Sequence, residues 1–277
     1  MTSLLAPLVA ALAVAQAAPA AKPGSPAPAA VQTAATFDHS DFDAVLKKHL
    51  HGERVDYKAL KADRAALDGY CARLEKLAKG DFEKLSRDEQ MALWINAYNA
   101  LTLRSIVDAY PIKAPTFKLN TFPKNSIRQI SDVWEKKHPV AGRDVSLEDI
   151  ENEILRKEWK DPRIHAAINC ASKGCPALRG EAFVAARLSD QLDEQMKKFV
   201  ADTARNQVDP KAKKVALSSI FKWFAEDFGT KPDSGKDERA ILKWLTKFGP
   251  ADWKSFLDGF DPDDVAILDY DWELNDV

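Results

Sequence analysis

The sequence predicts an α+β fold, in which a mainly helical single domain is built around a small β-sheet. Several segments carry apolar residues at helical spacing, whereas only short runs are typical of strands. No internal repeat and no long interior linker follows the first 36 residues, so we expect residues 37–277 to form one domain. With 277 residues, of which 45% are hydrophobic, the chain is long enough to bury a sizeable core.

The charge balance argues against nucleic acid as a partner. Lysine and arginine number 40 against 42 aspartates and glutamates, which gives a net charge of −2 and no basic excess. The sequence also lacks a glycine-rich phosphate loop, an HExxH zinc-protease motif and a GxSxG serine-hydrolase motif. We therefore expect no nucleic-acid partner, no cofactor and no bound metal.

The beginning of the chain differs in composition from the rest. Residues 4–21 are apolar, rich in alanine and free of charge, and the Ala-Gln-Ala at 15–17 has the small-x-small pattern of a signal-peptidase site. We predict a cleavable signal peptide over residues 1–17 and a flexible Pro/Ala-rich linker over residues 18–36, and hence a periplasmic or secreted protein. Pro7 and the alanines make a poor spanning helix, so no stable membrane span is expected. A disordered alanine-rich leader is the alternative.

The first predicted helices come from residues 42–50 and 60–77. Both segments repeat apolar residues every three or four positions, and Gly52 marks a turn between them. Cys71 lies within the second helix, where we expect it to act as a small buried hydrophobic residue rather than as a nucleophile.

A capping box begins the next helix. Ser86 and Glu89 have the spacing of that motif, and the apolar pattern that follows runs to a stop near Pro111. Asn96 and Asn99, three residues apart, share one side of this helix. Asparagine is a mediocre residue for a helix interior, so both need hydrogen-bond partners. They either tie down neighbouring backbone or orient a catalytic group or a substrate.

A second cap precedes the segment in which unusual residues gather. Ser146, with Asp149 three residues later, predicts a helix that ends near Asp161, because a proline follows there. Residues 164–170 then form a nearly continuous apolar run between that proline and a glycine-containing loop. Such a run is typical of a buried strand, and we predict one here.

The remainder of the chain continues the alternation of helices and strands. We predict helices over residues 188–201 and 220–228 and from Ser234 to Gly249, and strands over residues 215–217 and 265–268.

Five motifs give the chain a resemblance to a known family. They are ALWINAYNALTL (92–103), SLEDIENEILR (146–156), DPRIHAAINCASKGCPAL (161–178), IFKWFAEDF (220–228) and YDWELN (270–275). In this order, and over most of the chain after residue 37, they resemble the domain-of-unknown-function 547 family. The resemblance implies relatives among exported bacterial proteins and among plant proteins that carry the domain behind a coiled-coil segment, and a fold and role similar to those of cysteine peptidases.

The resemblance also implies which residues of the site are regular in the family. It makes His165 and Cys170 the regular pair, whereas Cys175 is replaced by serine in the plant branch. One position departs from the pattern, because the family's Ile-Glu-His is Ile-Glu-Asn here, with Glu151 followed by Asn152. A base contributed by that histidine is absent from this chain, and we therefore place the base at His165.

The candidate site is residues 161–178, where one histidine and two cysteines gather. A thiol becomes a nucleophile when a neighbouring imidazole or a helix N-terminus favours its thiolate. His165 and Cys170 are five residues apart, so a regular strand would point them to opposite faces, and their pairing needs a bulge or a strand that ends before Cys170. Cys175, at a possible helix start, meets the electrostatic requirement more simply. The family pattern favours Cys170, which we take as the nucleophile.

A catalytic imidazole also needs a polar group to orient it. The candidates are Asn96, Asn99 and Glu151, with Asp227 as a weaker choice. The predicted reaction is acyl transfer, in which a thioester formed from an amide or ester is hydrolysed or passed to an amine, as in a peptidase or amidase. Its substrate would be a small molecule or a peptide.

Other interpretations of the cluster remain open. Cys170 and Cys175 could form a disulfide in an oxidising compartment. A zinc site could use His165 and both cysteines, although no fourth ligand is evident. His165 could also be a buried neutral residue. In these cases the protein would be a non-catalytic periplasmic interaction module whose partner is an envelope protein.

Overall fold

The structure is a computed structural model that describes residues 35–113, 121–230 and 239–277. The part after Thr33 forms one compact unit. The predicted signal peptide and nearly all of the predicted linker lie outside the described residues. None of the described helices combines the length and the apolarity that a membrane crossing requires.

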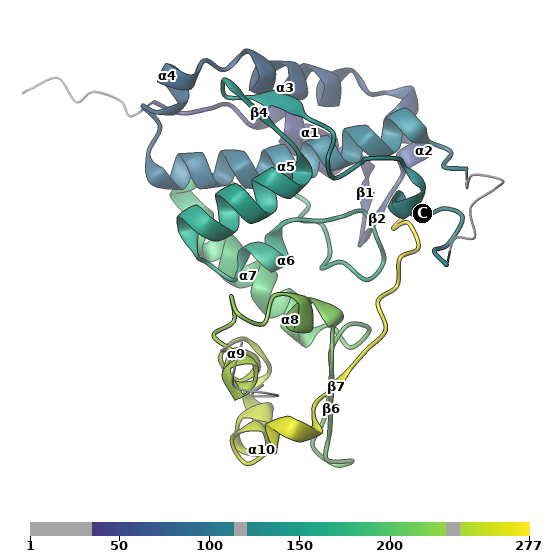
Figure 1. The fold of residues 1–277 in the computed structure, drawn as a ribbon, viewed down its shortest axis with the longest axis vertical. Helices are drawn as coiled ribbons and strands as arrows, with labels where there is room; N and C mark the ends of the chain where they lie inside the picture. Colours follow the sequence, from purple (N-terminus) through teal and green to yellow (C-terminus); the bar gives the residue numbers. More distant parts are fainter. Residues whose placement is uncertain (1–34, 114–120, 231–238) are drawn as a thin grey trace, which may run out of the picture. The chain divides into compact units, whose positions relative to one another are not determined.

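The 23-residue helix α5 (Arg87–Ala109) is the centre of the larger hydrophobic core (Figure 1). Its side chains are buried on almost every side, which is typical of a helix surrounded by other elements. The Oγ of Ser86 accepts a hydrogen bond from the N–H of Glu89 (3.2 Å), so the predicted start is confirmed. The Glu89 carboxylate does not complete the capping box, because it accepts a hydrogen bond from the N–H of Phe37 instead.

Several helices share this core with α5. They are α1 (Ser40–His49), α2 (Tyr57–Ala62), α3 (Ala65–Lys76), α4 (Lys79–Phe82), η1 (Ile127–Gln129), η2 (Asp149–Trp159) and α6 (Ile164–Ala167). The prediction of one helix over residues 60–77 is wrong, because the chain breaks between α2 and α3. Asp63 ends the first helix, and the Arg64 guanidinium bonds Asp68 at the start of the second.

The strands form three small sheets within the described residues. Two are antiparallel hairpins, and in the third β5 pairs antiparallel and β7 parallel with β6. The strands are β1 (Leu50–His51), β2 (Arg54–Val55), β3 (His138–Val140), β4 (Arg143–Val145), β5 (Gln207–Asp209), β6 (Lys214–Leu217) and β7 (Ala266–Ile267). The predicted strands over residues 215–217 and 265–268 are thus confirmed, the second at reduced length. The fold is the predicted mainly helical α+β arrangement.

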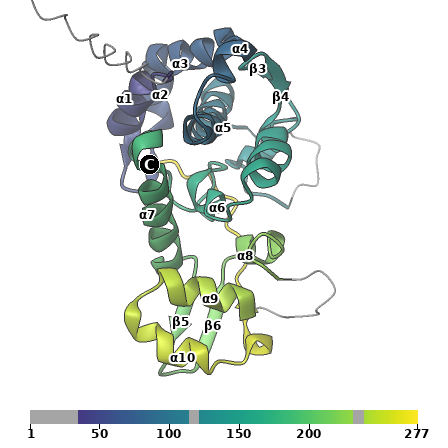
Figure 2. The same cartoon turned by 90° about the vertical axis from the view of Figure 1, so that its left-hand side faces the viewer.

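A second, smaller core packs helices against the β5–β6–β7 sheet (Figure 2). The helix α7 (Leu188–Ala201) joins the two cores, since Leu192 is buried in the first and Phe199 in the second. The other helices of this part of the chain are η3 (Ala185–Arg187), α8 (Ser219–Trp223), α9 (Arg239–Phe248), η4 (Ala251–Trp253), α10 (Lys254–Asp258) and η5 (Pro262–Asp264).

Two helices of this region differ from their predicted bounds. The helix predicted over residues 220–228 is shorter, because α8 ends at Trp223 and the chain continues as turns to Gly229, whose φ of 95° is in the left-handed region. The predicted cap at Ser234 lies outside the described residues, whereas the helix it was expected to begin is confirmed as α9.

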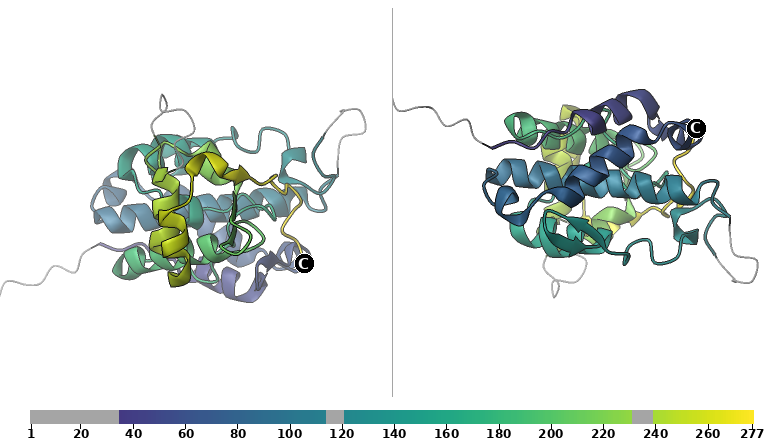
Figure 3. Two further views of the ribbon diagram at one scale, coloured as in Figure 1. Left: turned by 90° about the horizontal axis from the view of Figure 1, so that it is seen from below. Right: turned by 90° about the horizontal axis from the view of Figure 1, so that it is seen from above.

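The C-terminal segment leaves the smaller core and runs back to the larger one (Figure 1), and Figure 3 shows the molecule from its two ends. It is held by backbone hydrogen bonds from Lys173 to Glu273 (2.8 Å), from Gly174 to Asp271 (2.8 Å) and from Val55 to Asn275 (2.9 Å). This return places the aromatic residues of the segment against the loop that contains both cysteines.

Candidate functional site

The segment predicted as a strand is a short helix followed by extended chain. α6 covers Ile164–Ala167, and the prediction of a strand over residues 164–170 is therefore wrong. The extended part is held by asparagine side chains instead of a neighbouring strand. Asn99 donates to the C=O of Ala167 (3.0 Å) and accepts from the N–H of Asn169 (2.8 Å). An apolar run does not distinguish a buried strand from a short buried helix, and these side-chain bonds remove the need for a sheet partner.

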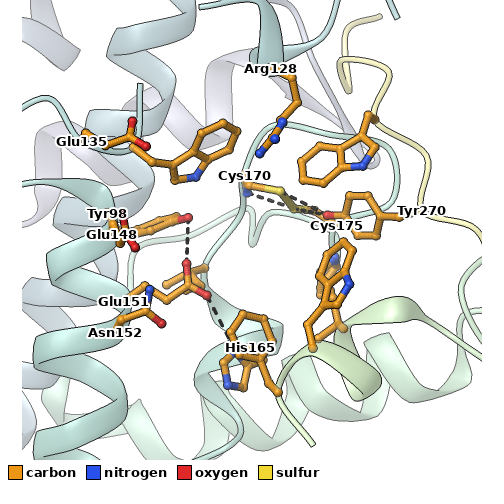
Figure 4. Close-up of a pocket in the computed structure, with 17 residues that line it drawn as sticks. Tyr98, Arg128, Glu135, Glu148, Glu151, Asn152, His165, Cys170, Cys175 and Tyr270 are labelled. Atoms are coloured by element: carbon orange, nitrogen blue, oxygen red, sulfur yellow. Dashed lines mark hydrogen bonds and ion pairs between the residues drawn. A yellow bond between two sulfur atoms is a disulfide. The ribbon is translucent and has the colours of Figure 1, made fainter. Parts of the chain in front are cut away.

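The cluster predicted from sequence lies at a cavity of about 350 Å³ (Figure 4). Its wall comes from α5, η1, residues 134–135, η2, α6, the loop with both cysteines, α8 and the C-terminal segment. The lining residues are Tyr98, Arg128, Trp134, Glu135, Glu148, Glu151, Asn152, His165, Ile168, Cys170, Cys175, Pro176, Ile220, Trp223, Phe224, Tyr270 and Trp272. Four of the six residues predicted for the site, His165, Cys170, Cys175 and Glu151, are therefore brought together.

His165 is oriented by Asp227. Its Nε2 lies 2.7 Å from the Asp227 Oδ2, and its ring stacks on Phe224 at 3.9 Å between centroids. Burial lowers the pKa of His165, and the hydrogen bond to Asp227 opposes that decrease. The carboxylate favours the tautomer with the proton on Nε2, so that Nδ1 carries the lone pair and lies 4.0 Å from the Glu151 Oε1.

Asp227 is itself held as an anion. Its two oxygens accept hydrogen bonds from Arg156 at 2.6 and 3.0 Å. Burial alone would raise the pKa of Asp227, but the hydrogen bonds from His165 and Arg156 outweigh burial and lower the pKa to about 2. Asn152 accepts a hydrogen bond from Arg156 (2.9 Å) and so helps to fix this guanidinium.

Glu151 is the second titratable group of the cavity. It projects from η2, a π-helix, a rare conformation that is frequent at functional sites. Ser146 and Asp149 form the predicted capping box at the start of this segment, although an α-helix was expected. Burial raises the pKa of Glu151 to about 7, whereas the hydrogen bond from the Tyr98 hydroxyl (3.2 Å) opposes this increase. A carboxyl group of this kind can donate or accept a proton near neutral pH.

The two cysteines are joined to each other. Cys170 and Cys175 form a disulfide, with their Cα atoms 6.3 Å apart, which was one of the alternatives predicted from sequence. The N–H of Cys170 and the Tyr270 hydroxyl both donate to the Cys175 Sγ, each at 3.0 Å. Within the described part of the chain no hydrogen bond links the His165 ring to either sulfur. In this oxidised state neither sulfur is a nucleophile.

Neither a zinc site nor a third reactive cysteine is found among the described residues. The described residues contain no group of three or more His, Cys, Asp or Glu side chains arranged to hold a metal ion. The zinc alternative therefore lacks a ligand set in this part of the chain. Cys71 is buried, as predicted, and burial raises the pKa of its thiol to about 11.

Asn96 and Asn99 do not line the cavity. Asn96 exchanges hydrogen bonds with the backbone C=O (2.8 Å) and N–H (2.9 Å) of Phe183, and Asn99 bonds the chain on both sides of Ile168. Their contacts match the first of the two predicted roles, which is to tie down neighbouring backbone. Asn99 thereby helps to position the segment between His165 and Cys170.

Sequence reasoning missed the aromatic wall and the arginine beside it. Trp134, Trp223, Tyr270 and Trp272 come from three separate stretches, and Arg128 from a fourth. Two of these stretches, IFKWFAEDF and YDWELN, were visible as motifs. Nothing in their spacing indicates that they meet at the cysteines, because the contact depends on the path of the C-terminal segment.

Comparison with known proteins agrees with the resemblance seen in the sequence. Residues 82–200 match the family described as Protein of unknown function, DUF547. The matched range contains His165, Glu151 and both cysteines, but not Asp227 or the C-terminal aromatic residues. No curated protein and no solved structure gave a match. Over residues 82–200, the chain is similar to the DUF547 family of proteins of unknown function, which is the family that its motifs resemble.

Proposed function

We propose that the protein is a cysteine-dependent acyl-transfer enzyme, similar to a peptidase or amidase, that acts after export to the periplasm or the exterior. The observation that carries the proposal is that an Asp227-oriented His165 and both cysteines line one cavity. A base held by a carboxylate beside a thiol is the arrangement that nucleophilic thiol catalysis requires. A disulfide is compatible with the oxidising compartment that export would provide.

The thiol becomes available when the disulfide is reduced. A dithiol reductant, itself oxidised to a disulfide, would convert the Cys170–Cys175 bond into two thiols. We assign the nucleophile to Cys170, whose side chain is partly exposed, whereas Cys175 is only 4% exposed. Once the bond is broken, the Cys170 side chain is free to turn into the cavity that it shares with His165.

The reaction then proceeds through a thioester. His165 Nδ1 takes the thiol proton, and the Cys170 thiolate attacks the carbonyl carbon of an amide or ester, forming a carbon–sulfur bond. When the carbon–nitrogen or carbon–oxygen bond breaks, the leaving group takes the proton from His165. Water, deprotonated by His165, or an amine then attacks the thioester and releases the thiolate. Glu151, with its pKa of about 7, can exchange protons with the incoming water or amine.

The proposal is tested with two serine variants and the activated ester p-nitrophenyl acetate. Cys175→Ser leaves Cys170 free without any reductant, so we expect a burst of nitrophenol and one acetyl group on Cys170, detected by mass spectrometry. The matched Cys170→Ser variant frees only Cys175 and should give no burst. His165→Gln in the Cys175→Ser background should slow the burst by about a hundredfold or more. Acetylation at equal rates in the two serine variants would refute the proposal.

A second candidate function is a non-catalytic interaction module. Two observations favour it, namely the disulfide, which removes the thiol, and the Trp223 side chain, which is 49% exposed beside Trp272. An exposed tryptophan suits docking on an envelope protein. Mass mapping of the exported protein decides between the candidates. A quantitative Cys170–Cys175 disulfide, together with no acylation after reduction, would favour the interaction module.

A further inference from the structure

Arg128 is held in a fixed place at the edge of the cavity. It lies in η1, where its neighbours Ile127 and Gln129 are both buried and where Ser126 accepts a hydrogen bond from its N–H (3.2 Å). Because the backbone is anchored on both sides of Arg128, the direction in which its side chain projects is fixed. Figure 4 shows it reaching toward Cys170.

Three aromatic rings support the Arg128 guanidinium. Its Cζ lies 4.5 Å from the centroid of Phe122, 5.1 Å from that of Trp272 and 5.2 Å from that of Trp134. Cation–π contacts of this kind occupy the faces of a guanidinium and leave the N–H groups at its edge free to donate. Phe122 and Trp134 lie near the middle of the chain and Trp272 near its C-terminus, so the contact depends on the complete fold.

The guanidinium of Arg128 has no acidic partner in the described part of the chain. Arg156, Arg163 and Arg179 behave differently, since each forms ion pairs with carboxylates at about the distance of a hydrogen bond. At Arg128 no Asp or Glu of the described residues lies within 4.0 Å, although Glu135 lines the same cavity. Its edge is therefore available to a ligand.

We propose that Arg128 binds a free carboxylate of the substrate, such as the C-terminal carboxylate of a peptide, and holds it beside Cys170. The role of this carboxylate in catalysis rests on the proposed acyl-transfer function, whereas its binding to Arg128 can be measured without that function. The planar guanidinium matches a carboxylate through two parallel hydrogen bonds. Glu135 and Glu148 line another side of the cavity (Figure 4) and repel an anion placed there, which confines the carboxylate to Arg128.

The test measures binding in a protein that cannot react. The full chain with Cys170→Ser and Cys175→Ser is titrated by calorimetry with N-acetyl-dialanine and with its C-terminal amide, which differ only in the carboxylate. The same titrations are made after adding Arg128→Gln or Arg128→Lys. Arg143→Gln is the matched control, because Arg143 also lies over an indole, that of Trp94 at 5.4 Å, but does not line the cavity.

The free acid should bind at least about tenfold more tightly than the amide, as expected for a charge-assisted pair. Arg128→Gln should abolish this preference, Arg128→Lys should keep part of it, and Arg143→Gln should leave it intact. Equal binding of acid and amide, a preference that survives Arg128→Gln, or no saturable binding of the acid would overturn the proposal. Because the protein titrated has no reactive thiol, a retained preference together with failed acylation would refute only the acyl-transfer function.

Discussion

Replacing Glu151 by glutamine removes a buried carboxyl group whose ionisation the fold opposes. Burial raises the pKa of Glu151 from 4.5 to about 7, in spite of the hydrogen bond from Tyr98. Between these two values the folded protein keeps a proton that the unfolded chain has lost. The free energy of unfolding that this group contributes is therefore fully present below about pH 4.5 and is lost as the pH rises through about 7.

The magnitude follows from the pKa difference. From 4.5 to about 7 the difference is about 2.5, which at about 1.4 kcal/mol per pKa unit gives about 3–4 kcal/mol. Glutamine at position 151 has no proton to lose and keeps a hydrogen-bonding group near Tyr98. Relative to the variant, the unmodified protein should therefore lose about 3–4 kcal/mol of stability between about pH 4.5 and about pH 8.

Urea denaturation of the oxidised full chain, followed by tryptophan fluorescence across this pH range, measures the difference. Glu148→Gln is the control, since Glu148 lines the same cavity but is exposed, and it should follow the unmodified protein. If Glu151→Gln and the unmodified protein keep a constant stability difference over the whole range, Glu151 is not a carboxyl of raised pKa, and its assignment as a proton donor fails.

Three further predictions concern the surroundings of the site. Asn99→Ala leaves two buried backbone groups unsatisfied and should lower the free energy of unfolding, measured in urea, by about 2–4 kcal/mol. The control Thr102→Val removes a buried hydroxyl that has no partner among the described residues, and it should change this free energy by less than about 1 kcal/mol. Equal losses would contradict the role of Asn99. Asp227→Asn should lower the pKa of His165 further, because that carboxylate favours the charged ring, and an unchanged NMR titration would contradict this. Cys71, with a pKa of about 11, should resist iodoacetamide until the protein is unfolded; labelling in the folded state would contradict its burial.

The helical part of the fold was predictable because its signals are local. The cap at Ser86 and the apolar repeat after it define α5, and the repeat over residues 188–201 coincides with the observed α7. The strand over residues 164–170 was wrongly predicted because a short apolar run carries no periodicity. What decides its conformation is Asn99, whose hydrogen bonds reach 68 and 70 residues along the chain.

Several residues of the candidate site could be predicted from the sequence, but the contacts between them could not. The sequence placed His165 near both cysteines, and the structure brings all three to one cavity. The partner of the imidazole is Asp227, 62 residues away, which was named only as a weaker candidate. Arg128 and Trp272 could not be predicted, because their meeting depends on the return of the C-terminal segment and not on any local pattern.

Alkylation of the reduced protein by iodoacetamide near neutral pH tests most directly whether His165 and Cys170 work together. The rate at Cys170 is followed by mass spectrometry in the unmodified protein and in His165→Gln, with free cysteine as the reference. We predict that Cys170 reacts much faster than free cysteine and that His165→Gln removes at least about nine-tenths of this rate. Activation of the thiol by the imidazole would be contradicted if Cys170 reacted no faster than free cysteine and if His165→Gln left its rate unchanged.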